Sequence, residues 1–230
     1  VVIAGIDHRE TSYSTVAFDA TYRFITGKAP ATTAIVAEKA VMLGGKVTGL
    51  GVDPLDPKTG NFSNKLPLPG AQLEVFATHP TTGAREGAAL LRTTVGKDGQ
   101  WGPLKVQPGV PLEFVISAPG YATTHIYRSG FPRSSDIIHL RAGRMADADK
   151  TADSVVTLTR ALGHLDPARD KMMLDGAPPA GVPAGAGAAS AKIKPAGGQR
   201  TITAEFNGER VAGQTWPARE GKVVMLEISQ

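Results

Sequence analysis

Asp7 and His8 are adjacent residues whose types are suited to acid–base chemistry. An imidazole titrates close to neutral pH, so His8 could act as a general base that takes up and returns a proton. Neighbouring side chains in an extended loop point apart, so we expect Asp7 to orient the loop or bind backbone rather than act together with His8. The competing interpretation of His8 is a loop histidine that merely bonds the backbone.

A nucleophile for His8 cannot be recognised in the sequence. The 230 residues contain no cysteine and no G-x-S-x-G elbow. Zero cysteines also exclude disulfides and thiolate metal sites. His79, His125 and His139 have no spacing typical of metal ligands, so no metal site is predicted.

The elements that must position His8 are a strand and a helix. Residues 1–6 form a short apolar run that breaks at Gly5, which predicts a strand leading into the Asp-His loop. Ser14 is placed to cap a helix over about 15–26, and Gly27 follows where a left-handed residue is favoured. The sequence starts without methionine inside this apolar run. We therefore expect it to be the C-terminal portion of a longer polypeptide.

This strand, Asp-His step and capped helix resemble the end of the hydrolase domain in lipases and esterases of the α/β-hydrolase fold. The resemblance covers residues 1–30 and implies that His8 is the general base of a serine triad. Catalytic residues of that fold follow the order Ser, Asp or Glu, His. The implied partner is an N-terminal hydrolase portion that carries the serine and the acid. The implied substrate is an ester, lipid or polyester, the implied location secreted or periplasmic, and no cofactor is implied.

The composition argues against nucleic acid as a partner. The chain has 25 basic and 21 acidic residues, a net charge of +4, and no run of three basic residues. Nucleic-acid binders concentrate Lys and Arg on one helix or face, so a mildly basic solvated surface explains the charge better. The sequence also has no apolar run long enough to span a bilayer.

Residues 31–148 are expected to form a β-sandwich accessory domain. Turn formers separate short segments of strand character, which is typical of an antiparallel sandwich. The predicted strands are 41–51, 72–77, 90–95, 101–106, 112–117, 123–127 and 137–140. A loop rich in proline and glycine is predicted over 53–70. Another loop, over 127–136, combines two aromatic residues with two arginines, so it could dock on the hydrolase or border its substrate entrance, or its arginines could pair with local acids.

Four signals in this segment resemble the carboxypeptidase-regulatory-like, transthyretin-type sandwich. They are Lys46-Val47-Thr48-Gly49, Leu68-Pro69-Gly70-Ala71, Lys97-Asp98-Gly99-Gln100-Trp101 and Ser117-Ala118-Pro119-Gly120-Tyr121. Modules of that family are usually non-catalytic, so the resemblance implies an accessory or lid-like role.

Residues 149–230 are expected to form a second small β domain. Strands are predicted over 154–160, 201–206, 210–216 and 222–228. Asn207-Gly208 is a strong hairpin signal between two of them. Strand order and terminal position resemble the C-terminal β region of some microbial lipases, which covers or borders the active site.

The predicted fold class is therefore mainly β, with the last strand, loop and helix of an α/β-hydrolase fold followed by antiparallel β-sandwich domains. The leading hypothesis is the C-terminal part of a serine ester hydrolase of the lipase or esterase type, incomplete because the nucleophile and triad acid are missing. The alternative hypothesis is a non-catalytic β-sandwich module for binding or adhesion. An upstream G-x-S-x-G elbow would favour the first hypothesis over the second.

Overall fold

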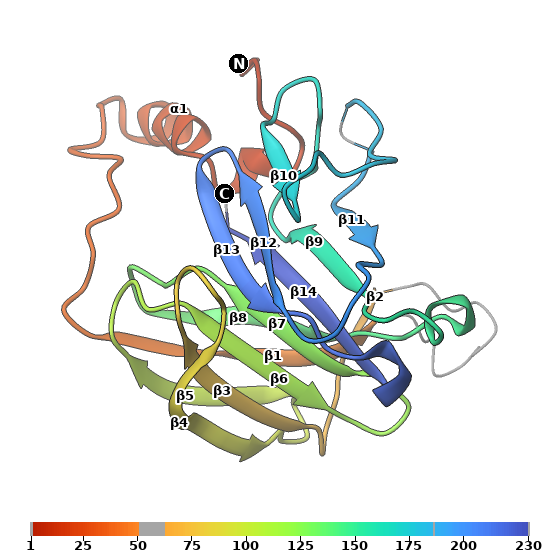
Figure 1. Ribbon diagram of the computed structural model, residues 1–230. Coiled ribbons are helices and arrows are strands. Elements are labelled where there is room, and N and C mark those ends of the chain that lie inside the picture. The colour runs from red at the N-terminus through yellow and green to blue at the C-terminus, as the bar shows by residue number, and fades with distance from the viewer. Residues whose placement is uncertain (1, 51–62, 186, 230) are drawn as a thin grey trace.

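The computed structural model describes residues 2–50, 63–185 and 187–229 and is built mainly from strands (Figure 1). The expected mainly β fold class is confirmed. The helical elements are η1(Glu10–Ser12), α1(Thr15–Thr26), η3(Asp147–Asp149) and η4(Ala218–Glu220). The strands are β1(Val41–Leu50), β2(Ser63–Pro67), β3(Gln72–Thr78), β4(Arg85–Thr94), β5(Gln100–Val106), β6(Leu112–Ser117), β7(Thr123–Arg128), β8(Ser135–Ala142), β9(Val156–Arg160), β10(Met172–Leu174), β11(Ser190–Ile193), β12(Thr201–Phe206), β13(Glu209–Gln214) and β14(Lys222–Ile228).

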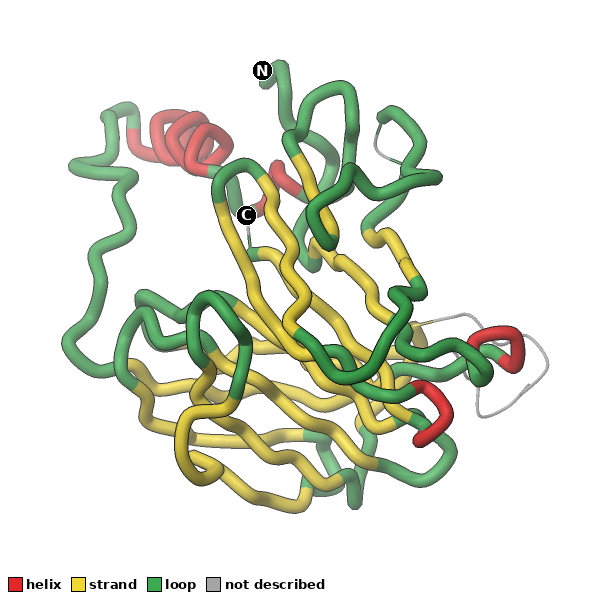
Figure 2. Tube along the Cα trace, in the orientation of Figure 1, coloured by secondary structure: helices red, strands yellow, loops and turns green. Residues whose placement is uncertain are grey.

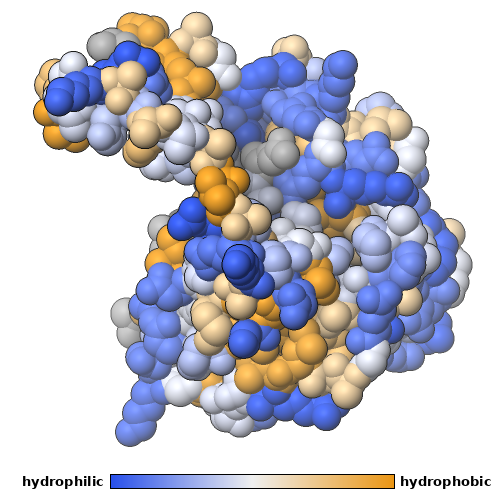
Figure 3. Space-filling model, turned by 90° about the vertical axis from the view of Figure 1, so that its left-hand side faces the viewer, coloured by the Kyte–Doolittle hydropathy of each residue, from blue (hydrophilic) through white to orange (hydrophobic). Residues whose placement is uncertain are grey.

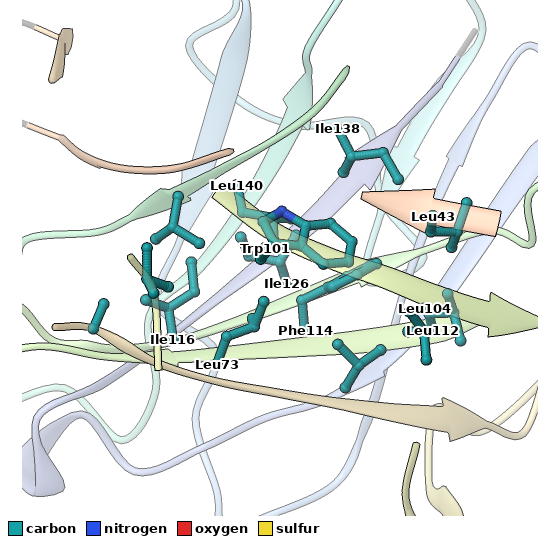
Figure 4. Close-up of a cluster of buried hydrophobic side chains, with 14 of the residues drawn as sticks. Leu43, Leu73, Trp101, Leu104, Leu112, Phe114, Ile116, Ile126, Ile138 and Leu140 are labelled. Carbon is teal, nitrogen blue, oxygen red and sulfur yellow. The ribbon is translucent and has the colours of Figure 1, made fainter. Parts of the chain in front are cut away.

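Strands β1–β8 build a β-sandwich. One sheet has the order β2-β1-β5, with β8 also paired to β1, and it faces strands β4, β3, β6 and β7. Alternating side chains of both sheets fill the space between them (Figure 4). Trp101 and Phe114 meet edge to face at its centre, with ring centroids 5.6 Å apart. The buried apolar side chains of this first core account for the alternation in the sequence.

A seven-stranded sheet joins the sandwich to the later strands. Its order is β11-β9-β14-β7-β6-β3-β4, so backbone pairing continues across the predicted domain boundary at 148/149. The antiparallel sheet β10-β12-β13 covers part of its outer face and encloses a second core around Phe206, Leu158 and Leu226. The first core draws mainly on residues before 148 and the second mainly on residues after it. The division of the chain into segments 1–30, 31–148 and 149–230 stays a prediction.

The strands predicted over 31–148 and 149–230 form, and each of their ends lies within five residues of the expected position. Three pairings are parallel, namely β1 with β8, β14 with β7 and β14 with β9, so the sheets are mixed where purely antiparallel ones were predicted. Strands β2, β10 and β11 were not predicted. Of the predicted 53–70 loop, residues 53–62 lie outside the described residues, and β2 occupies 63–67.

The predicted strand over residues 1–6 is wrong. Residues 2–6 form a turn and irregular backbone, and no described strand lies beside them to satisfy their N–H and C=O groups. The helix that follows is confirmed at both ends. Ser14 Oγ accepts a hydrogen bond from the backbone N–H of Ala17, and Gly27 adopts the left-handed conformation at φ 69°.

Helix α1 stands away from the β-sheets. A stretch of irregular chain over 27–40 separates it from β1 (Figure 2). Ala17 is the buried residue of the helix, whereas Phe24 and Ile25 are 87% and 73% exposed. Figure 3 shows the helix as a projection that carries hydrophobic surface. Its length falls well short of a bilayer span, and the same holds for every other described helix.

Candidate active-site loop

His8 lies at the surface, in the turn before η1. Its backbone carbonyl accepts a hydrogen bond from Thr11 Oγ1 at 2.6 Å. Its imidazole bonds no side chain or backbone group of the described residues. A histidine in this position is available to a group outside the described chain, which general-base chemistry would require.

Asp7 binds backbone, as the sequence predicts. One carboxylate oxygen, Oδ1, accepts the N–H groups of Arg9 and Glu10 at 2.7 and 3.0 Å, and Oδ2 accepts the N–H of His164 at 2.8 Å. Burial raises the pKa of Asp7, but these three backbone hydrogen bonds outweigh it and hold the pKa below its ordinary value. Asp7 is therefore an ionised group that fixes the loop beside His8.

Glu10 gives the loop a second anchor, which the sequence did not predict. Its Oε1 accepts from Arg160 Nη2 at 2.5 Å, and its Oε2 accepts from Arg169 Nη1 at 2.8 Å. The Arg160 side chain is 4% exposed, and its Nη1 donates to the carbonyl of His164 at 2.8 Å. Buried charges are tolerated when they are paired and hydrogen-bonded in this way. The loop is consequently held by the end of β9 and the chain that follows it.

Arg169 extends the anchor to the β12–β13 hairpin. It pairs with Asp170 at 3.0 Å, and Asn207 Nδ2 donates to the same carboxylate at 3.0 Å. The pKa of Arg169 is raised, mainly by its hydrogen bond to Asp170. Burial raises the pKa of Asp170, but Arg169 and Asn207 outweigh it and lower the pKa overall. We call Asp7, Glu10, Arg160, Arg169 and Asp170 the anchor cluster.

A second buried polar network lies on the outer face of the seven-stranded sheet. Glu113, whose side chain is 0% exposed, accepts from Arg85 Nε at 2.5 Å, His125 Nδ1 at 2.7 Å and Tyr127 OH at 2.9 Å. Trp216 Nε1 donates to Tyr127 OH at 3.1 Å, and its ring stacks on His125 with centroids 4.3 Å apart. The network joins β4, β6 and β7 to the segment after β13.

Burial sets the protonation of this network. It lowers the pKa of His125 even though Glu113 opposes the shift, so His125 is neutral at pH 7. Burial raises the pKa of Glu113, but hydrogen bonds from His125 and Arg85 outweigh it and lower the pKa overall. A carboxylate can only accept, so the proton of His125 sits on Nδ1, and its Nε2 has no partner among the described residues. The arrangement is that of a structural network with no access for substrate.

The remaining histidines do not come together. His79 lies in the turn after β3, and His139 Nε2 bonds Thr48 Oγ1 at 2.6 Å on the opposite sheet. Within residues 2–50, 63–185 and 187–229, no three His, Asp or Glu side chains converge as metal ligands would.

The loop over 127–136 forms ion pairs and also lines a cavity. Its arginines pair with acids, Arg128 with Glu227 at 2.7 Å and Arg133 with Glu38 at 3.5 Å. It also lines a cavity of about 520 Å³ that reaches Arg9 of the His8 loop. The interpretation as a loop with locally paired arginines is therefore confirmed, and the loop also borders a hollow beside the candidate residue.

Residues 39–145 match the family described as the lipase C-terminal domain. This is just under half of the chain. A lipase C-terminal β domain was predicted, but the match falls on the sandwich and not on residues 149–230. The transthyretin-type resemblance and the α/β-hydrolase segment stay predictions. No curated protein matches the chain.

Solved structures resemble the chain weakly. The TIE protein of Bacillus anthracis is 14% identical over 82% of this chain, with a TM-score of 0.27, and this chain spans 34% of its length. Catechol 1,2-dioxygenase from Acinetobacter sp. ADP1 is 13% identical, covering 59% of this chain and 70% of that one, with a TM-score of 0.27. The shaft pilin SpaA from Lactobacillus rhamnosus GG, as a double mutant, is 12% identical, covering 84% and 98%, with a TM-score of 0.29. Such low TM-scores indicate no function for this chain.

Proposed function

We propose that this chain is the C-terminal part of a serine ester hydrolase of the lipase or esterase type, acting on an ester, lipid or polyester outside the cytoplasm. The observation that carries the proposal is the match of residues 39–145 to the lipase C-terminal domain, directly after the His8 loop and its helix. The β segments then shape access to a catalytic site that an N-terminal hydrolase portion completes.

His8 is the general base in this proposal. Its imidazole is exposed and unbonded, while the backbone around it is fixed by Asp7 and Glu10. It would take the proton of an upstream serine and then protonate the leaving alcohol. Both oxygens of Asp7 are occupied by backbone N–H groups, so the acid that orients His8 would also come from the upstream portion.

Helix α1 supplies the surface on which that portion would dock. Phe18, Phe24 and Ile25 are each about half or more exposed on a helix that no described sheet covers, and Phe18 and Ile25, seven positions apart, share one face. Exposed apolar side chains gathered on one such helix mark a contact with another protein surface. In this proposal α1 completes the hydrolase domain, and the irregular chain over 27–40 connects it to the sandwich.

The test is turnover of a short-chain 4-nitrophenyl ester by the polypeptide extended upstream to include the preceding coding region. His8→Ala should lower kcat by about 10²–10⁴, the usual contribution of a general base. His79→Ala, an exposed histidine in a turn, is the matched control and should leave kcat unchanged. Full turnover by H8A, or turnover by residues 1–230 alone, would show that the proposal is wrong and favour a non-catalytic binding module.

A further inference from the structure

A cavity of about 520 Å³ opens between the loop after β7, strand β8 and the chain that follows β9. Its volume falls within the range of about 300–1,000 Å³ that is usual for small-molecule sites. Arg9 contributes to its lining, so the cavity begins one residue from His8.

The walls of the cavity are largely apolar. Phe131, Ile137 and Leu162 line it, and Ile137 and Leu162 are 84% and 47% exposed. Apolar side chains gathered around a hollow favour a ligand with a hydrocarbon part, because covering them removes apolar area from water.

The charges around these walls are predominantly positive. Arg128 is neutralised by Glu227, whose carboxylate lies 2.7 Å from its Nη2. Arg9 and Arg141 also line the cavity, and neither has a carboxylate partner among the described residues. Arg9 Nη1 has only a long contact of 3.4 Å to the carbonyl of Gly163. Two guanidinium groups therefore stand free to receive an anion, and a carboxylate matches their fork geometry.

We propose that this cavity binds a free fatty-acid anion. The carboxylate lies between Arg9 and Arg141, and the hydrocarbon chain lies along Phe131, Ile137 and Leu162. The proposal rests on the proposed function to the extent that ester hydrolysis at His8 supplies such an acid next to the cavity. A neutral ester or alcohol of equal length makes the same apolar contacts and lacks the charge that Arg9 and Arg141 recognise.

Isothermal titration of the 230-residue chain with dodecanoate, dodecanol and acetate, each below its aggregation concentration, tests the proposal. We expect dodecanoate to bind at least tenfold more tightly than dodecanol, and acetate to give no measurable binding. Arg141→Met should reduce the affinity for dodecanoate toward that for dodecanol, with Arg9 left to pair with the carboxylate. Arg144→Met is the matched control, since Arg144 lies outside the cavity with its guanidinium 5.3 Å from the Tyr121 ring.

Equal affinity for dodecanoate and dodecanol would overturn the proposal, as would an equal loss of affinity in R141M and R144M or the absence of binding. Ile137→Asp gives a second check, because it places a negative charge in the apolar wall and should abolish binding without disturbing the sandwich core. The titration needs no turnover, and His8→Ala should bind dodecanoate like the unmodified chain. A negative result in the hydrolase assay and a negative result in the dodecanoate titration can thus be told apart.

Discussion

Glu10 and Arg160 are 150 positions apart in the chain, and their side chains meet in an ion pair of 2.5 Å between Oε1 and Nη2. Glu10 belongs to the turn after His8, and Arg160 ends strand β9. The pair, together with Asp7 and Arg169, fixes the loop of the candidate general base to the last β segment. The backbone of the loop that carries His8 is thus held by residues far from it in sequence.

Arg160→Met should loosen this loop. The substitution keeps much of the side-chain volume but leaves the buried Glu10 carboxylate with two remaining partners, Arg169 and the backbone N–H of Asp7, at a cost of about 3 kcal/mol. Hydrogen exchange should accelerate at the amides of Arg9 and His164, which bind Asp7. Arg210→Met is the control, because its pair with Glu205 is 3.7 Å long and half exposed, and it should change stability by less than about 1 kcal/mol. Unchanged exchange in R160M would refute the anchoring role.

Acid should weaken the anchor cluster through Asp7. Its pKa in the folded chain lies below its ordinary value, so the unfolded chain binds a proton more readily. The stability that Asp7 contributes is present above about pH 4, near the unfolded pKa, and is lost as pH falls through the lower folded value. Urea denaturation between pH 6 and pH 2 should show a smaller acid loss for Asp7→Asn. Asp136→Asn, an exposed position with no hydrogen bond or ion pair of its side chain among the described residues, should keep the full acid loss.

Only part of the anchor cluster could be predicted from the sequence. Asp7 could be predicted to bind backbone because it is next to His8 in a loop. Arg160 and Arg169 could not be predicted, since a partner 150 residues away leaves no local pattern at either end. The predicted strand over 1–6 failed for a related reason. Apolar residues indicate burial, but a strand also needs a neighbouring strand, and the described chain provides none.

Most of the fold could be predicted, because nearly every strand alternates and is bounded by turn formers. Asn207 and Gly208 adopt φ values of 47° and 94°, the hairpin turn that their types favour. Strand β2 was missed because its sequence is polar and ends in proline, and β10 and β11 because they have only three and four residues. Parallel pairing could not be predicted, since alternation indicates which face is buried and not which strand lies alongside.

Glu113→Gln should destabilise the whole chain. The amide cannot neutralise Arg85, and in either orientation its NH₂ group faces a donor, either Arg85 Nε or His125 and Tyr127, so we expect a loss of about 3–5 kcal/mol in the free energy of unfolding. Glu74→Gln is a close control on the neighbouring strand β3. Its pair with Arg92 is 2.6 Å long but 37% and 68% exposed, and its loss should stay below about 1 kcal/mol. Similar losses in the two variants would contradict the network's structural role.

Gly213→Ala should disturb the packing of β13 on the seven-stranded sheet. A methyl group there would lie 2.6 Å from Tyr127 Cδ2 and 2.9 Å from Leu226 Cδ2, which forces the strand outward. Overpacking of this kind costs about 1–3 kcal/mol, measurable by urea denaturation. Gly198→Ala is the control, since nothing lies within 4 Å of its added methyl group. An unchanged midpoint for G213A would show that β13 packs more loosely than described.

Lysines in place of Phe24 and Ile25 should leave the isolated chain as stable as before, within about 0.5 kcal/mol, because both side chains are exposed. In the polypeptide extended upstream, the same double substitution should lower the temperature at which ester hydrolysis is lost. Arg23→Ala, on the face of α1 that carries Asp19, is the control and should not. Equal heat inactivation of the double variant and the parent would argue against docking through this face.

Strand β14 lies between β7 and β9 and is parallel to both, although it is the last of the described strands in sequence order. Before it is synthesised, β7 and β9 each present an open edge with unpaired N–H and C=O groups. A ribosome that stalls or terminates shortly before residue 222 would therefore release a chain with two unpaired strand edges and an incomplete second core. Such truncated products should aggregate or be degraded, so only chains that contain β14 should accumulate as folded protein.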